Sequence, residues 1–139
     1  GSKRAYAYSK YLSSEVVICY KQREKANKVS HMELIGNVKD KNVILVDDMV
    51  ATAGTLTKAA IHMKERGAIS VRAICTHALL SGDAYDKIEK SELEELIVTD
   101  SIAPRIRHNK VKVLSCAPLF AEVMHNLHFN KSISSKFIM

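Results

Sequence analysis

The chain has 139 residues, of which 47% are hydrophobic and 26% are charged, as expected of one soluble globular domain. No apolar run is long enough to span a membrane, and the three cysteines show neither disulfide nor zinc spacing, so we expect a cytoplasmic protein. The net charge of +6 suits a phosphate-rich ligand or nucleic acid, but the sparse aromatic residues and the lack of a known nucleic-acid motif argue against nucleic acid.

Apolar periodicity predicts an alternation of strands and helices along the chain. Helices are expected over residues 2–12, 54–66 and 84–90 and from Pro118 to about His128, and strands over 16–20, 32–35, 43–47, 71–76, 96–99 and 111–115. The strand over 16–20 is expected to be buried, and residues 21–28 are expected to form a basic loop. This order predicts an α/β fold with a doubly wound, mainly parallel sheet, in which ligands bind at the carboxyl ends of the strands.

The run over residues 43–55, VILVDDMVATAGT, is the most informative part of the sequence. An apolar strand leads to Asp47 and Asp48, then to small and hydroxyl residues, and a helix follows that closes at Gly67. Free N–H groups and the helix dipole at such a helix start favour an anion. Two carboxylates beside it can hold ribose hydroxyls or a hydrated magnesium ion, so a sugar phosphate is the expected ligand.

This run resembles the phosphoribosyl-diphosphate (PRPP) binding motif of the type I phosphoribosyltransferase fold, in which two hydrophobic residues and two acids precede a Thr-x-Gly-Thr-like loop. The resemblance implies that Asp47 and Asp48 face the ribose diol. It also implies that the loop grips the 5′-phosphate of ribose 5-phosphate, through Ala51, Thr52, Ala53, Gly54 and Thr55.

Five further segments resemble the PRPP synthetase (ribose-phosphate diphosphokinase) family. They are YKQREKANKV at 20–29, THALLSG at 76–82, the pair LIVTDSI at 96–102 and KVLS at 112–115, and KSIS at 131–134. The resemblance runs in order over the whole chain. It implies that residues 1–139 form a single phosphoribosyltransferase-like domain, the C-terminal half of a synthetase without its N-terminal domain. The family transfers diphosphate from Mg-ATP to the anomeric hydroxyl of ribose 5-phosphate, giving PRPP and AMP.

The same resemblance assigns roles to individual residues. It places Lys21 and Arg23 on the transferred β-phosphoryl group, for which charge neutralisation matters more than a protein nucleophile. It places Ser132 and Ser134 at an allosteric phosphate site between subunits. Family members are homo-oligomers, so a homo-oligomer is the expected assembly. Mg²⁺ is the expected cofactor, carried mainly by the substrate phosphates.

One residue departs from the family pattern. Ala51 stands where the family usually has an acid that holds the ribose or assists the anomeric hydroxyl, and alanine can neither take a proton nor accept a hydrogen bond through its side chain. Two alternatives therefore stay open. One is a non-catalytic relative that binds sugar phosphate and regulates assembly. The other is a type I phosphoribosyltransferase that consumes PRPP, although no segment with stacking aromatic residues for a nucleobase is evident.

Overall fold

The computed structural model describes residues 2–21, 32–103 and 105–137. A helix, α1 (Ser2–Leu12), precedes the strands β1 (Ile18–Lys21) and β2 (Met32–Ile35). The chain continues through β3 (Asn42–Val50), α2 (Gly54–Glu65), β4 (Ser70–Ala78), α3 (Ala84–Glu89), β5 (Glu95–Thr99) and β6 (Val111–Leu114). It ends in α4 (Ala117–His128) and a short 3₁₀ turn, η1 (Ser134–Lys136).

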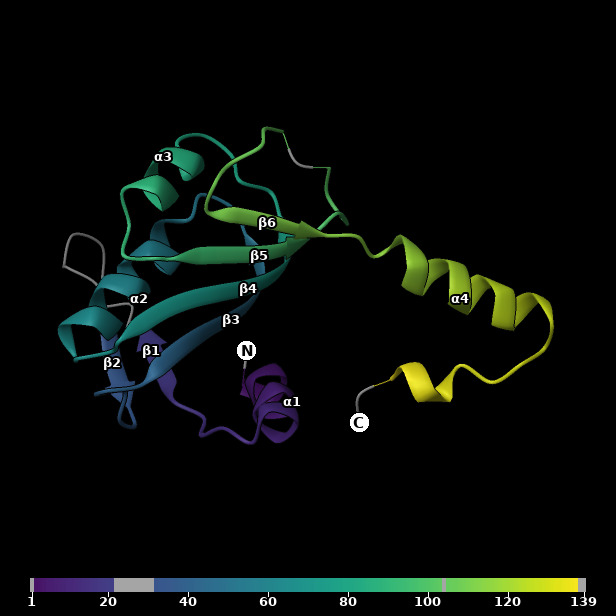
Figure 1. Ribbon diagram of the computed structural model, residues 1–139, viewed down its shortest axis with the longest axis horizontal. Coiled ribbons are helices and arrows are strands. Elements are labelled where there is room, and N and C mark those ends of the chain that lie inside the picture. The colour runs from purple at the N-terminus through teal and green to yellow at the C-terminus, as the bar shows by residue number, and fades with distance from the viewer. Residues whose placement is uncertain (1, 22–31, 104, 138–139) are drawn as a thin grey trace.

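The central sheet is parallel and has the order β3-β4-β5-β6, with helices flanking it (Figure 1). This confirms the predicted α/β class. Parallel neighbours place their carboxyl ends at the same edge of the sheet. The pairing of Met49 with His77 and of Cys75 with Val98 brings the segments after β3, β4 and β5 to one side. The predicted ligand edge is therefore the side of the sheet at which these three segments meet.

The strand predicted over 16–20 differs from the expectation. It begins at Ile18 and pairs antiparallel with β2 in a separate two-stranded sheet, and Ile18 and Tyr20 are 43% and 56% exposed. The prediction of a buried strand is therefore wrong. The apolar run carried no information about which sheet it would join, because that depends on the neighbours available in three dimensions.

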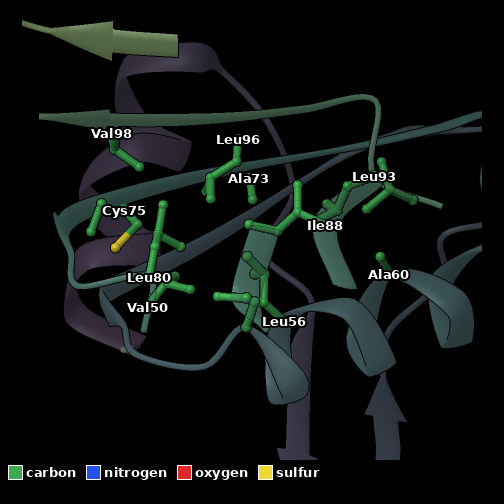
Figure 2. Close-up of a cluster of buried hydrophobic side chains, with 14 of the residues drawn as sticks. Val50, Leu56, Ala60, Ala73, Cys75, Leu80, Ile88, Leu93, Leu96 and Val98 are labelled. Atoms are coloured by element: carbon green, nitrogen blue, oxygen red, sulfur yellow. The ribbon is translucent and has the colours of Figure 1, made fainter. Parts of the chain in front are cut away.

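The hydrophobic core lies between the central sheet and the helices α2 and α3. Figure 2 shows side chains from β3, α2, β4, α3 and β5 pointing into one cluster. Small side chains on α2 and β4, such as Ala60 and Ala73, are fully buried and let the helix approach the sheet closely. Larger ones, such as Ile88 and Leu96, fill the space that remains. The core thus fixes α2, and with it the loop that precedes α2, against the carboxyl edge of β3.

The outer edge of β3 has no strand neighbour among the described residues. A cavity of about 700 Å³ lies along this edge, and residues of α1, β1, β2, β3 and α2 line it. Its lining is mainly apolar, for example Val17, Val43 and Leu45, but Asp47 and Thr55 also border it. Polar and charged residues such as Lys41 and Asn42 line it as well, so the cavity by itself does not single out the part beside Asp47 and Thr55.

The C-terminal helix α4 extends away from the sheet, and the tail turns back beside it (Figure 1). None of its residues is buried, and Phe120, Met124 and Leu127 are all more than half exposed. Asp100 fixes the start of α4, because its Oδ1 atom accepts hydrogen bonds from the backbone N–H and the thiol of Cys116 at 2.8 and 2.9 Å. The helix is therefore anchored at its beginning rather than packed along its length.

Candidate functional site

The two predicted acids lie within β3, which extends three residues beyond the predicted strand end at 47. Asp47 Oδ1 accepts a hydrogen bond from the backbone N–H of Asp48 at 2.9 Å, which orients the first carboxylate. Burial raises the pKa of Asp47, and the nearby Asp48 carboxylate adds to the rise. A hydrogen bond from Asp47 lowers the pKa of Asp48, and the charge of Arg4, 3.6 Å away on α1, acts in the same direction. The two carboxylates thus shift each other's pKa in opposite directions, and their oxygens can accept hydrogen bonds from hydroxyl groups.

The predicted phosphate loop follows directly and is shaped by an unusual alanine. Ala53 has φ 58° and ψ −4°, in the left-handed region, and it is buried at 4% exposure. Its carbonyl accepts the backbone N–H and the hydroxyl of Thr57, at 2.9 and 3.0 Å, which ties the loop to the first turn of α2. Left-handed residues at a helix start turn successive N–H groups to one side, a backbone geometry that binds anions.

The loop amides have no hydrogen-bond acceptor in the part of the chain that the structure describes. Among the described residues, no protein acceptor faces the N–H groups of Thr52, Ala53, Gly54 or Thr55. The carbonyls before them are engaged: Val50 O accepts from Leu79 and Leu80, and Ala51 O accepts from Ser81. Because C=O and N–H point in opposite directions in a trans peptide, the N–H groups of Ala51 and Thr52 face away from the segment 79–81.

Gly54 is not required by the backbone. Its φ lies outside the left-handed region, and a Cβ atom built there would meet only Thr52 Oγ1, at 4.0 Å. The protein itself therefore has room for alanine at position 54. A glycine in such an open place allows a ligand to approach the backbone closely.

Ala51, which stands where the family usually has an acid, lies at the start of the loop. It lies in the exposed first part of the loop, after the two acids, where its methyl group supplies no acceptor. Among the described residues, no group of three or more His, Cys, Asp or Glu side chains could hold a metal ion. Asp47 and Asp48 supply carboxylate oxygens, which fits a Mg²⁺ ion that keeps its waters and is shared with substrate phosphates.

The remaining predicted residues are not brought to this loop by the described part of the chain. Lys21 is the last residue of β1, its side chain lies outside what the structure describes, and Arg23 lies outside the described residues altogether. Ser132 and Ser134 are exposed, and their hydroxyls are 2.9 Å apart beside η1, in the tail that turns back along α4 (Figure 1). Their predicted phosphate site stays a prediction.

A second polar cluster lies at the carboxyl ends of β4 and β5. His77 Nδ1 is 2.9 Å from Ser101 Oγ, and the hydroxyls of Thr99 and Ser101 donate to the carbonyl of Thr76 at 2.8 and 3.1 Å. Two segments, 76–82 and 96–102, thus contact each other at the ligand edge. The sequence indicated their importance only by resemblance, since their contacts join residues more than 20 positions apart.

Known proteins share the sequence and the fold of this chain over most of its length. Residues 5–138 match the family model described as phosphoribosyl synthetase-associated domain. A ribose-phosphate pyrophosphokinase of Campylobacter jejuni is 51% identical over 99% of this chain and 45% of its own length, and one of Porphyromonas gingivalis is 50% identical over 99% and 44%. The crystal structure of phosphoribosylpyrophosphate synthetase from Mycobacterium smegmatis superposes with a TM-score of 0.77 at 30% identity, over 91% of this chain and 42% of that one.

The chain thus spans less than half the length of the relatives that it matches. The match extends through the acidic pair, the loop and the segments at the carboxyl edge, and it confirms the resemblance on which the site was predicted. The chain belongs to the phosphoribosyl synthetase-associated domain family.

Proposed function

We propose that residues 1–139 are the ribose-5-phosphate- and PRPP-binding domain of a ribose-phosphate diphosphokinase, corresponding to the C-terminal half of its relatives. The observation that carries this proposal is the left-handed Ala53 before α2, directly after the Asp47–Asp48 pair, in a loop whose amides have no acceptor among the described residues. The amides and the helix start would bind the 5′-phosphate. The acidic pair, which lies in β3 just before the loop, would accept hydrogen bonds from the ribose hydroxyls.

In the proposed reaction the anomeric oxygen of ribose 5-phosphate attacks the β-phosphorus of ATP, and AMP leaves. Mg²⁺ would neutralise the phosphate charge, with Asp47 or Asp48 as a carboxylate ligand. Lys21 and Arg23 would reach the transferred group from the segment after β1. ATP, ribose 5-phosphate and PRPP are the proposed small-molecule partners. A region corresponding to the part of the relatives that this chain does not cover would supply the ATP pocket. The proposed assembly is a homo-oligomer in the cytoplasm.

In the described residues, no helix is both long and apolar enough to cross a membrane.

Titration calorimetry with ribose 5-phosphate tests the binding half of the proposal. We expect binding of ribose 5-phosphate and much weaker binding of ribose, because only the former engages the loop amides. Equal affinity for the two sugars, or no binding of either, would contradict the proposed site. Loss of PRPP that depends on an added nucleobase would instead support a phosphoribosyltransferase.

AMP release from Mg-ATP and ribose 5-phosphate tests the catalytic half. The chain is assayed with the part of the Campylobacter jejuni relative that it does not cover, so that an ATP pocket is present. Ala51→Asp is expected to raise turnover, because it restores a proton acceptor at the anomeric hydroxyl. Ala51→Asn is the matched control, since it adds a side chain of the same shape that takes no proton.

A non-catalytic role is favoured by one specific observation, namely the methyl group of Ala51 at the exposed loop start. This alternative predicts ribose 5-phosphate binding without turnover in the native chain. It also predicts no gain in turnover from Ala51→Asp, because other catalytic groups would be missing. Turnover by the native sequence would exclude it.

A further inference from the structure

The segment Leu79-Leu80-Ser81 follows β4 and lies against the start of the phosphate loop. The carbonyl of Val50 accepts the N–H groups of Leu79 and Leu80 at 3.0 and 3.1 Å, and the carbonyl of Ala51 accepts the N–H of Ser81 at 2.8 Å. The hydroxyl of Ser81 lies 3.3 Å from the same Ala51 oxygen. Three consecutive amides thus hold two consecutive carbonyls, which is more than a continued parallel ladder requires.

Leu80 adopts an unusual backbone conformation to make these contacts. Its φ is 41°, in the left-handed region, where a leucine is rarely found. Its side chain is 2% exposed and points into the core cluster beside Val50 (Figure 2). The core therefore holds in place a conformation that the leucine backbone by itself disfavours. Strain of this kind, maintained by burial next to a candidate site, points to a positioning role.

We propose that segment 79–81 positions the phosphate loop, with Leu80 and Ser81 as the positioning residues. The physical route is the orientation of two peptide planes. With the Val50 and Ala51 carbonyls bound to segment 79–81, the N–H groups of Ala51 and Thr52 point away from it, toward the open side of the loop. The pre-oriented amides need no rearrangement when an anion binds. The ligand itself, ribose 5-phosphate, rests on the proposed function.

The simpler explanation is that 79–81 is only the connection from β4 to α3. In that case its conformation would affect folding stability but not the order or the affinity of the phosphate loop. A matched pair of isomeric substitutions separates the two explanations, because both members change buried packing but only one changes the left-handed backbone.

The pair is Leu80→Ile and Leu96→Ile in the full chain. Isoleucine has the volume of leucine, but its β-branch strongly disfavours a positive φ, so position 80 is affected through its backbone. Leu96 lies fully buried in β5, where a β-branched residue is readily accommodated. We expect Leu80→Ile to weaken ribose 5-phosphate binding by about tenfold and Leu96→Ile by less than about twofold.

Backbone NMR without ligand provides a readout of the loop itself. The amide signals of residues 52–55 are expected to shift or broaden in Leu80→Ile and to keep their native positions in Leu96→Ile. If Leu80→Ile changes neither these signals nor the affinity more than Leu96→Ile does, the positioning role is wrong, even where stability falls. If the native chain binds no ribose 5-phosphate, the proposed function fails, and the loop signals alone decide on the positioning role.

A second pair covers the case in which Leu80→Ile does not fold. Ser81→Ala removes the hydroxyl beside Ala51 O, whereas Ser91→Ala removes a hydroxyl that donates to Ile88 O at 2.7 Å at the end of α3. Both serines are half-buried. We expect about a twofold loss of affinity for Ser81→Ala, restoration by Ser81→Thr, and no loss for Ser91→Ala. Equal effects of the two alanine variants would overturn the proposal.

Discussion

The core region (residues 42–99) and the C-terminal region (residues 117–137) differ in how much apolar surface they bury. Among the described residues, every buried apolar side chain except Val38 belongs to the core region. The C-terminal region buries none, although α4 carries Leu119, Phe120 and Met124. Stability follows buried area, so the core region can preorganise a binding loop by itself. The C-terminal region, by contrast, presents an apolar face that another surface would have to cover.

The largest expected effect is on the free energy of unfolding, when leucine is replaced by alanine in each of the two regions. Leu96→Ala in the core region should lower the free energy of unfolding by about 2–5 kcal/mol, because it leaves a cavity among packed side chains. Leu119→Ala on α4, which is 50% exposed, should change it by less than about 0.5 kcal/mol. Urea unfolding measures both. A large loss from Leu119→Ala would show that α4 is covered in solution, which would break the comparison.

The next effect tests whether the core region preorganises the loop. Gly54→Ala should leave the free energy of unfolding within about 1 kcal/mol of the native value, because the new Cβ atom meets only Thr52 Oγ1 at 4.0 Å. The affinity for ribose 5-phosphate should fall by about tenfold, or about 1.4 kcal/mol, because the methyl group occupies the space of the ligand.

Gly67→Ala is the control for that experiment. Gly67 has φ 90° and a Cβ there would lie 3.2 Å from Lys39 Cγ, so alanine should destabilise the fold without touching the loop. Calorimetry and thermal unfolding on both variants give the two readouts. Unchanged affinity in Gly54→Ala would mean that no phosphate lies near this glycine.

A smaller effect concerns the connection between the core region and the strand that leads to α4. Lys110 Nζ donates to the carbonyls of Glu89 and Ser91 at 2.8 and 3.0 Å, which joins the start of β6 to the end of α3. Lys110→Met should cost about 1 kcal/mol in urea unfolding, since it leaves these carbonyls without the charged donor. Lys112 is paired with Glu95, and its side chain is 69% exposed. Lys112→Met should therefore cost less than about 0.5 kcal/mol.

The smallest effect is a pH dependence at the start of α4. Hydrogen bonds from Cys116 and Ser115 lower the pKa of Asp100 from 3.8 to about 2. Because the folded-state pKa is the lower one, the carboxylate stabilises the fold fully above about pH 4, and this contribution disappears as the pH falls toward 2. The amide NMR signal of Cys116 should shift in that window and lose the shift in Asp100→Asn. A signal that titrates equally in both proteins would contradict the assignment.

The order of the elements and the chemistry of the candidate site could be predicted from the sequence alone. Eight of these elements, α1 and α2 among them, lie close to their predicted ranges, because apolar periodicity and the residues that begin or end an element are local signals. The Asp47–Asp48 pair and the small residues before α2 were recognisable because strand, loop and helix start are consecutive in the chain. The resemblance to the synthetase family rested on the same local patterns, and the family match confirms it.

Features that depend on neighbours distant in the chain became evident only from the three-dimensional structure. It placed β1 in a separate antiparallel pair instead of the central sheet and left α4 without a buried face. It also showed the left-handed Leu80 and the contacts of Ser81 with Ala51, which join residues 30 positions apart. Periodicity reports how one segment partitions between water and a protein interior. It does not report which segment lies opposite, and that choice determined the geometry of the phosphate loop.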